Sequence, residues 1–281
     1  YFYDENGRLY SFQYTLVRAL VYAVRSYILM LALTDVETGR HYFVQQPVFS
    51  EKDIEIEEKM LRFRGDAVLT KEENGIRIAA KAADFSYDLF LDYGKGAFWH
   101  CDNGKLQMGI PGKRLTTLYY SYTNMPISGT ITLHGATHTV KGKGWFDKQG
   151  GTYPLLKTEC MWEWFSLRFF DDEEMMLFSF PQDGYADGTY IRADRTSVRL
   201  NDYTVEPKKF TVAAGYRFSS EWEVALPGRK DGHYFIRPLT DGQLTWFTSN
   251  FWRAFIPTPE SLPGTASWNL CRVYITKKST H

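Results

Sequence analysis

An indole and a carboxyl group near the middle of the chain are spaced to act together. Residues 144–151 read Gly-Trp-Phe-Asp-Lys-Gln-Gly-Gly, which places Trp145 and Asp147 two residues apart. In an extended strand such residues share a face, so both side chains could enter one pocket. A carboxylic acid in apolar surroundings keeps its proton at neutral pH, because desolvation raises its pKa. Aromatic faces stabilise a cation without capturing it. The pair is therefore a candidate for protonating a carbon–carbon double bond, with Asp147 as the proton donor.

A structural interpretation of this segment competes with the catalytic one. An aspartate followed by Lys-Gln-Gly-Gly commonly ends a strand and caps a turn. Strict alternation also puts Lys141 and Lys143 on the face of Asp147, and two lysines are expected on a solvated face. A bulge at Gly142 or Gly144 would reverse this facing. Residue patterns alone leave both interpretations open.

Two other polar residues could contact a ligand. His100 stands between Trp99 and the turn residues 102–104, so it is either a pocket donor or base, or a turn histidine making one hydrogen bond. Arg18 interrupts an apolar run and could bind an anionic or carbonyl group of a ligand. An ion pair between Arg18 and a carboxylate such as Asp35 is the favoured interpretation.

Composition argues against several classes of function. Thirty-three basic residues balance thirty-three acidic ones, which is unfavourable for nucleic-acid binding. Three widely spaced cysteines and the lack of a His-Glu-x-x-His motif argue against a metal site. Neither Gly-x-Ser-x-Gly nor a nucleotide-binding glycine loop occurs, so we expect no cofactor. The apolar stretch 16–33 contains Arg18, Arg25 and Ser26, and we therefore expect no membrane span.

Short β-rich runs separated by turn signals dominate the chain. Turn signals at residues 4–7, 34–39 and 71–75 are rich in Gly, Asn and Asp, which tolerate the positive φ of tight turns. This density of strands predicts an all-β sandwich or barrel. Residues 51–62 are the best helical candidate, although a short strand and a loop fit nearly as well.

A break near residues 150–154 predicts two domains. It separates two strand-rich halves of ordinary domain size, which we assign as residues 1–153 and 154–281. Trp162 and Trp164 alternate in the second half, so they share a face. They could line a cavity or seal the contact between the domains, and the second role is favoured.

Motifs spread over most of the chain follow the order and spacing of a known family. They lie at residues 1–3 and 10–13, 32–35, 98–104, 118–123, 129–131, 140–147, 162–168 and 222–227. Together they resemble the hydroxyneurosporene synthase (carotenoid 1,2-hydratase)/AttH family, in which two lipocalin-like domains are fused. The resemblance implies an all-β fold of two consecutive lipocalin-like antiparallel β-barrels. Leu118 and Lys148 depart from the His-rich family motifs, which counts against a carotenoid substrate more than against the fold.

The resemblance also implies a cofactor-independent hydratase, isomerase or cyclase. It would act on a hydrophobic polyene, terpenoid or polyketide-like molecule by proton-initiated hydration, isomerisation or cyclisation. We expect these catalytic residues: Asp147, Trp145, Tyr120 and Tyr119. We expect these substrate-binding residues: Tyr3, Phe12, Arg18, Trp99, His100, Tyr122 and Trp164. Two alternatives stay open, a non-catalytic carrier of an apolar ligand and a pericyclase-type cyclase that works by shape and hydrogen bonds.

The sequence leaves the cellular location and the oligomeric state open. It begins in a strand-like run at Tyr1, so residues upstream could have been trimmed. The cytoplasm is the favoured location, because no signal peptide is visible.

Overall fold

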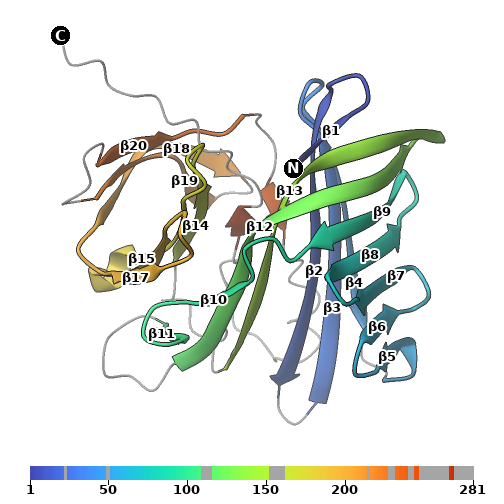
Figure 1. The fold of residues 1–281 in the computed structure, drawn as a ribbon, viewed down its shortest axis with the longest axis horizontal. Coiled ribbons are helices and arrows are strands. Elements are labelled where there is room, and N and C mark those ends of the chain that lie inside the picture. The colour runs from blue at the N-terminus through green and yellow to red at the C-terminus, as the bar shows by residue number, and fades with distance from the viewer. Residues whose placement is uncertain are drawn as a thin grey trace. The chain divides into compact units, whose positions relative to one another are not determined.

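The protein is built from antiparallel β-strands (Figure 1). The computed structural model describes residues 1–21, 24–48, 51–108, 116–151, 162–213, 216–226, 232–239, 244–246 and 266–268. These residues form strands and two short 3₁₀ turns, and no α-helix occurs among them. The prediction of an all-β, lipocalin-like fold is confirmed.

The described residues belong to two compact units. The first comprises Tyr1–Gly94 and Asn124–Gly144, and the second draws on Lys95–Thr123 and Trp145–His281. The long strands β12 (Thr116–Leu133) and β13 (Ala136–Gly151) contribute residues to both. The assignment of residues 1–153 and 154–281 as separate domains stays a prediction.

The first unit is a curled antiparallel sheet with the strand order β4-β3-β2-β1-β13-β12-β9-β8-β7-β6-β5. Figure 1 shows the sheet curling from the blue strands β2 and β3 round to the green strands β12 and β13. Its other strands are β1 (Phe2–Asp4), β2 (Leu9–Val21), β3 (Val24–Asp35), β4 (Arg40–Val48), β5 (Ile54–Ile56), β6 (Met60–Phe63), β7 (Ala67–Lys71), β8 (Gly75–Lys81) and β9 (Phe85–Asp92). Most of these strands pair with a sequence neighbour as hairpins, the simplest route to an antiparallel sheet, whereas β1 pairs with β13 and β9 with β12.

Alternation of apolar and polar residues explains how these strands bury one face. In β9, Phe85, Tyr87, Leu89 and Leu91 are buried while the residues between them are partly exposed. This period of two is that of a strand with one face toward a core. Where β12 crosses β9, Gly129 has a φ of 152°, and a Cβ there would lie 2.1 Å from a carbonyl oxygen of β9. Glycine therefore allows the two strands to approach at this point.

The expected turns connect strands as predicted, and the helical candidate does not form a helix. Residues 4–7, 34–39 and 71–75 join β1 to β2, β3 to β4 and β7 to β8. Within 51–62, the turn η1 (Glu51–Asp53) leads into β5, which pairs with β6. The strand-and-loop alternative is therefore the correct one, because β5 and β6 gain cross-strand partners that a lone surface helix would lack.

The second unit contains shorter strands in several sheets. The strands β10 (Ala97–Trp99) and β11 (Lys105–Gln107) pair with the first part of β12. One sheet has the order β14 (Glu163–Arg168), β15 (Glu174–Phe180), β16 (Tyr185–Ile191) and β17 (Ser197–Leu200), with η2 (Pro181–Asp183) between β15 and β16. A second contains β18 (Thr204–Ala213), β19 (Tyr216–Ala225) and β20 (His233–Ile236), and β21 (Leu244–Trp246) pairs with β22 (Ala266–Trp268).

Strand β15 is buried on both faces and divides the core of the second unit. Its residues Met175 and Leu177 belong to a cluster around Trp222, which we call the Trp222 cluster. The alternate residues Met176 and Phe178 belong to the Phe178 cluster, whose other buried members are Cys101, Leu106, Met108, Tyr119 and Phe180. The period of two along β15 thus supplies both clusters from one strand.

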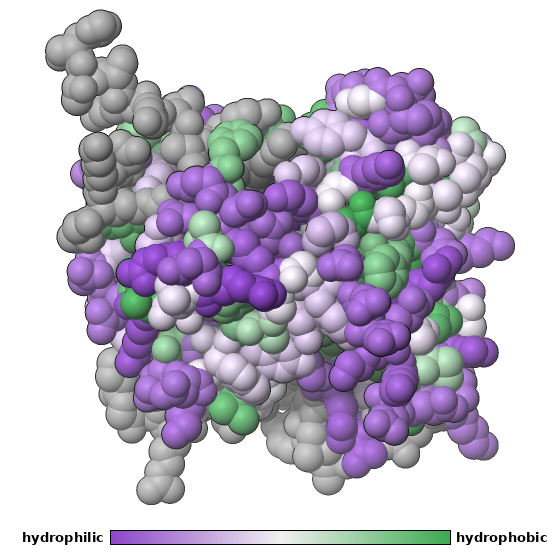
Figure 2. Space-filling model, in the orientation of Figure 1, coloured by the Kyte–Doolittle hydropathy of each residue, from purple (hydrophilic) through white to green (hydrophobic). Residues whose placement is uncertain are grey.

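The outer surface is mainly polar on the face shown in Figure 2, with apolar side chains scattered between charged ones. Single apolar residues on a surface are ordinary. None of the helices among the described residues is long and apolar enough to span a membrane.

Candidate functional site

The carboxyl group of Asp147 accepts three hydrogen bonds on a single oxygen. Oδ1 accepts from the Tyr119 hydroxyl at 2.6 Å, from the Ser121 hydroxyl, and from the Trp145 indole N–H at 2.8 Å. Tyr119 and Ser121 are two residues apart on β12, so strand alternation turns both toward the same side. In the described part of the chain, Oδ2 has no hydrogen-bond partner. The two oxygens of this carboxyl group therefore have different surroundings.

Asp147 is accessible to solvent and yet poorly hydrated. The residue is exposed by its accessible surface, but protein surrounds the carboxyl group densely, and this desolvation raises its pKa above the ordinary 3.8. Hydrogen bonds from Ser121, Tyr119 and Trp145 act against that rise. Accessible surface decides whether water or a ligand reaches the group, whereas the surrounding protein decides how well its charge is hydrated. The residue exposure and the dense surroundings of the carboxyl group are therefore compatible.

Tyr119 is held from three sides. Its hydroxyl accepts a hydrogen bond from the Trp164 indole at 3.1 Å, and its ring lies 4.5 Å from the His100 ring and 6.0 Å from that of Phe178, centre to centre. The side chain is buried, and burial raises the pKa of the phenol well above its usual value. Tyr119 therefore remains a hydrogen-bond donor to Asp147 at any physiological pH.

His100 is fully buried and supports Ser121. The imidazole is 0% exposed, and its Nε2 lies 2.7 Å from the Ser121 hydroxyl oxygen. Burial lowers the pKa of His100 to about 3, so the ring is neutral at physiological pH. Among the described residues, its other nitrogen, Nδ1, has no hydrogen-bond partner. His100 thus lies behind Ser121, and its role in binding a ligand stays a prediction.

Two tryptophans form an aromatic wall beside the carboxyl group. The rings of Trp145 and Trp164 meet edge to face, 6.4 Å apart at an interplanar angle of 82°. Both rings, together with Trp162, pack on the Phe178 cluster. Trp162 and Trp164 therefore share a face of the chain, as alternation predicts. The Trp145 indole N–H reaches Asp147 and the Trp164 indole N–H reaches Tyr119, so both rings belong to the hydrogen-bond network of the carboxyl group.

The two lysines that share a strand face with Asp147 do not bond its carboxyl group. Asp147 takes its donors from one tyrosine, one serine and one tryptophan. Lys141 is exposed and pairs through its backbone with Tyr3 of β1. Lys143 donates its backbone N–H to the carbonyl of Tyr1. Both lysines belong to the first unit and Asp147 to the second.

Three predicted site residues lie on the opposite face of β12 from Asp147. Tyr120 and Tyr122 alternate with Tyr119, so they point away from the carboxyl group. Trp99 pairs with Tyr120 across β10 and β12, and their ring centres are 5.0 Å apart. Trp99 is 54% exposed. The structure brings none of these three rings to Asp147.

The predicted residues of β1 and β2 belong to the first unit. Tyr3 is partly exposed and meets Tyr1 edge to face. Phe12 stacks on Phe2 at 5.5 Å and meets Tyr87 edge to face at 5.7 Å. Phe12 is therefore part of the aromatic packing of the curled sheet, and its role in binding stays a prediction.

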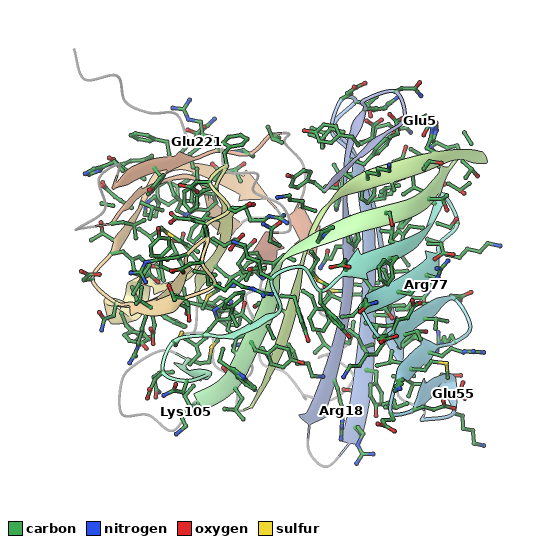
Figure 3. The ribbon with its side chains drawn as sticks, in the orientation of Figure 1. Glu5, Arg18, Glu55, Arg77, Lys105 and Glu221 are labelled. Atoms are coloured by element: carbon green, nitrogen blue, oxygen red, sulfur yellow. The ribbon has the colours of Figure 1, made fainter. Side chains whose placement is uncertain are left out.

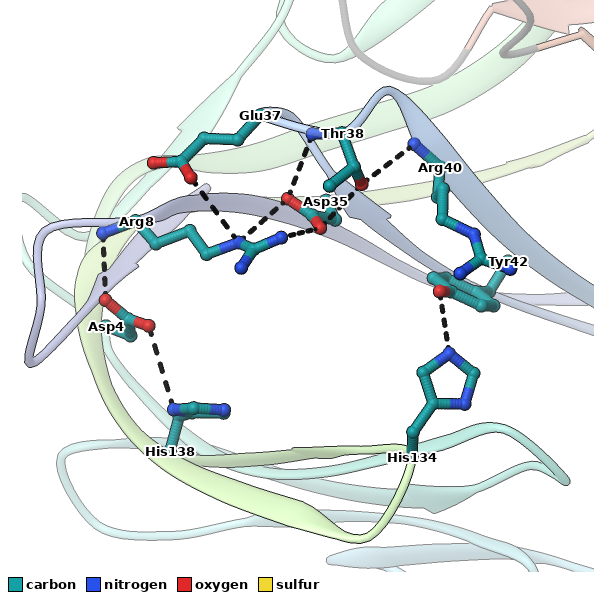
Figure 4. Close-up of polar contacts among 9 residues, drawn as sticks. All are labelled: Asp4, Arg8, Asp35, Glu37, Thr38, Arg40, Tyr42, His134 and His138. Atoms are coloured by element: carbon teal, nitrogen blue, oxygen red, sulfur yellow. Dashed lines mark hydrogen bonds and ion pairs between the residues drawn. The ribbon is translucent and has the colours of Figure 1, made fainter.

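The predicted ion pair between Arg18 and Asp35 is wrong. Arg8 pairs with Asp35 instead, through a guanidinium that contacts both carboxylate oxygens (Figure 4). The β2–β3 register places Asp35 opposite Tyr10 and Arg18 opposite Tyr27, about 27 Å apart along the sheet at 3.4 Å per residue. Figure 3 shows Arg18 near one end of β2 and Glu5 near the other.

Ser121 is the site residue that sequence reasoning missed. Serine is common in strands and turns, so its presence in the motif at 118–123 carried no signal of its own. Its spacing of two residues from Tyr119 was the available signal, because alternation puts both hydroxyls on one face. Among the described residues, no three His, Cys, Asp or Glu side chains gather as a metal site would require.

Comparison with known proteins relates the chain to one family and to solved structures of similar fold. A family model described as AttH-like matches residues 1–267. A putative AttH from Nitrosomonas europaea has a similar fold, with a TM-score of 0.78 and 22% identity over 89% of this chain and 80% of that one. Kievitone hydratase from Nectria haematococca has a TM-score of 0.70 and 17% identity over 86% of this chain and 76% of that one. No curated protein matches the sequence.

Proposed function

Because the chain belongs to the AttH-like family, we propose that it is a cofactor-independent hydratase of a hydrophobic, unsaturated small molecule, with Asp147 as the proton donor. One observation carries the proposal. A poorly hydrated carboxyl group stands beside the Trp145 indole, with three donors on Oδ1 and, among the residues that the structure describes, none on Oδ2. The similar fold of kievitone hydratase supports hydration as the reaction class.

The reaction begins with proton transfer from Asp147. The O–H bond at Oδ2 breaks, and the proton bonds to one carbon of the double bond through the π electron pair. Positive charge develops on the other carbon, where the faces of Trp145 and Trp164 stabilise it. The raised pKa of Asp147 favours this step, since the acid is present at a higher pH than for an ordinary aspartic acid.

Addition of water completes the cycle. A water oxygen bonds to the cationic carbon, and the resulting oxonium returns a proton to the Asp147 carboxylate. The product is the substrate plus one water, and no electrons are exchanged. In the carboxylate state the hydroxyls of Tyr119 and Ser121 stabilise the negative charge on Oδ1. Asp147 thus acts first as acid and then as base.

The partly buried indoles favour an apolar group next to Asp147. Trp145 and Trp164 pack on the Phe178 cluster and yet are only partly buried, so part of each side chain is left accessible, and apolar contacts dominate small-molecule sites. Trp99, Tyr120 and Tyr122 form a second aromatic group on the other face of β12. If these three residues bind the substrate as predicted, they contact a part of it that is distant from the double bond protonated by Asp147.

The test compares wild type with one isosteric variant. Kievitone, named by the hydratase of similar fold, serves as the first defined probe, alongside any hydrophobic compound that co-purifies and is identified by native mass spectrometry. Wild type should release a product one water heavier, and Asp147→Asn should reduce turnover at least a hundredfold. Asp202→Asn, which alters an exposed aspartate of the same unit, is the matched control and should keep full turnover.

The other outcomes separate the alternatives. A compound that binds wild type and is recovered unaltered identifies a carrier. Turnover that survives Asp147→Asn but not a bulky substitution in the aromatic wall identifies a pericyclase-type enzyme, and it removes Asp147 as the proton donor.

A further inference from the structure

The turn that carries His100 fixes the imidazole in one position. Cys101, Asn103 and Gly104 all have positive φ, at 54°, 48° and 86°. The backbone N–H of His100 donates to the Tyr119 carbonyl at 3.1 Å, and its carbonyl accepts from Gly104 at 2.7 Å. The N–H of Cys101 donates to the hydroxyl of Thr189 at 2.9 Å. Non-glycine residues rarely adopt a positive φ, and they keep it only where surrounding contacts hold the backbone in place. The hydrogen bonds to Tyr119 and Thr189 are such contacts.

The donors and acceptors around Ser121 can be assigned by counting protons. A serine hydroxyl has one proton to donate and two lone pairs to accept with. In the ionised state of Asp147 the Ser121 hydroxyl donates to it, because a carboxylate can only accept. The contact between Ser121 and His100 must then use a proton on the imidazole. The ring is therefore the Nε2–H tautomer, and its bare nitrogen is Nδ1, which has no partner within the described part of the chain.

The same count fixes the direction of the second chain of hydrogen bonds. The Trp164 indole can only donate, so the Tyr119 oxygen accepts from it and the Tyr119 proton goes to Asp147. Together with the Trp145 N–H and the Ser121 hydroxyl, the Tyr119 hydroxyl gives Oδ1 three donors. An oxygen that accepts three hydrogen bonds has no lone pair left to hold a proton. The acidic proton must therefore reside on Oδ2.

We propose that His100 is a positioning residue. By donating from Nε2 to the Ser121 oxygen, it keeps the Ser121 hydroxyl donating its hydrogen bond to Oδ1 of Asp147. Oδ2 is then the oxygen that delivers the proton to the substrate. This inference rests on the proposed role of Asp147 as the donor. It assigns His100 a place behind the site, in contact with neither the substrate nor the reacting atoms. Its role is to prevent Ser121 from turning its proton away and accepting one from Asp147.

The first experiment reads the tautomer in the wild-type protein. A long-range proton–nitrogen NMR correlation spectrum distinguishes protonated from bare imidazole nitrogens, with His100→Gln used to assign the signals. His100 should show a protonated Nε2 and a bare Nδ1 across the neutral range. Observation of the Nδ1–H tautomer overturns the proposal, because Ser121 would then have to donate to His100 and could not donate to Asp147.

The second experiment measures the pKa of Asp147 by carbon-13 NMR of its carboxyl carbon, assigned with Asp147→Asn. Ser121→Ala should raise this pKa by about one unit, since it removes a hydrogen bond to the charged form. His100→Phe should raise it by a smaller amount. His100→Gln places an amide N–H near the former Nε2 and should restore the wild-type value. Tyr119 is the titratable group that contacts Asp147 directly, and it is unchanged in all three variants.

A double-mutant cycle separates positioning from packing. If His100 acts through Ser121, His100→Phe should add no further shift in a Ser121→Ala background. An equal shift in both backgrounds would show a general packing effect and overturn the proposal. Should His100→Phe fail to fold, His100→Gln and His100→Asn form the alternative pair, because an asparagine amide reaches the Nδ1 position instead and should not restore the pKa.

The two proposals fail in different ways. Loss of turnover in Asp147→Asn together with the wrong His100 tautomer would leave the hydratase proposal standing and remove the role of His100. If instead the tautomer and the pKa shifts are as predicted but Asp147→Asn keeps full turnover, the hydratase role of Asp147 would be removed. The hydrogen-bond network around Asp147 would then be confirmed, but Asp147 would not be the proton donor.

Discussion

Replacing Tyr119 by phenylalanine removes one oxygen that serves two partners. The hydroxyl donates to Oδ1 of Asp147 at 2.6 Å and accepts from the Trp164 indole at 3.1 Å. A hydrogen bond to a charged group contributes about 1.5–3 kcal/mol. Asp147 is open to solvent, and water can replace part of the lost bond, so the lower end of this range applies. At 1.36 kcal/mol per unit, the pKa of Asp147 should rise by about one unit in Tyr119→Phe.

The same change also lowers the free energy of unfolding, by an amount that depends on pH. Loss of a partner for the half-buried Trp164 indole costs about 1 kcal/mol at any pH. Above the pKa of Asp147, loss of the Tyr119 hydrogen bond to the carboxylate adds about 1.4 kcal/mol, which corresponds to the rise of about one pKa unit. A group with a raised pKa in the folded state contributes its full stability at low pH and loses it as the pH rises through the folded pKa. The deficit of Tyr119→Phe should therefore grow from about 1 to about 2.4 kcal/mol between acidic and neutral pH.

Carbon-13 NMR titration and urea unfolding at two pH values measure both effects. Tyr120→Phe is the matched control, because it makes the same chemical change on the opposite face of β12 and should leave the pKa of Asp147 in place. An unchanged Asp147 pKa in Tyr119→Phe would refute the hydrogen-bond geometry. An equal rise in Tyr120→Phe would refute the assignment of the two rings to opposite faces.

Other predictions concern two ion pairs, one within each unit. Arg8→Ala should lower the free energy of unfolding by about 1–2 kcal/mol at neutral pH, because it removes the partner of the buried Asp35 carboxylate. Burial raises the pKa of Asp35, but Arg8 and the hydroxyl of Thr38 outweigh it and hold this pKa below its usual value. The loss of unfolding free energy in Arg8→Ala, measured by urea unfolding, should therefore shrink as acid protonates Asp35. Arg18→Ala in the same assay should cost less than about 0.5 kcal/mol. Arg199→Ala should cost about 3 kcal/mol or more in thermal or urea unfolding, since it leaves the fully buried Asp187 carboxylate without its bidentate partner. A loss below 1 kcal/mol would show that this buried pair is not needed for stability.

Strand periodicity made part of the site predictable. Trp145 and Asp147 share a face, and so do Trp162 and Trp164, as a period of two requires. Periodicity could not decide whether Tyr119 or Tyr120 faces Asp147, because that choice depends on how β12 is set relative to β13. The structure places Tyr119 at the carboxyl group and Tyr120 behind the strand.

Long-range register explains what periodicity could not supply. Arg8 and Arg18 both lie near apolar runs, and either could pair with Asp35 by sequence alone. Twelve cross-strand pairs between β2 and β3 fix Asp35 at the end of the sheet where Arg8 lies. His100 was similarly ambiguous, since its burial depends on a turn of positive-φ residues that packs against β12.

The titration of Asp147 in the wild-type protein tests the central claim most directly. It needs no substrate, and the carboxyl carbon reports protonation of this one residue. If the carboxyl group is recessed among protein atoms and held by Tyr119, Ser121 and Trp145 through Oδ1 alone, its pKa lies clearly above the ordinary 3.8. A pKa at or below 3.8 would contradict the account, because Asp147 would then be a well-stabilised carboxylate with no special ability to donate a proton.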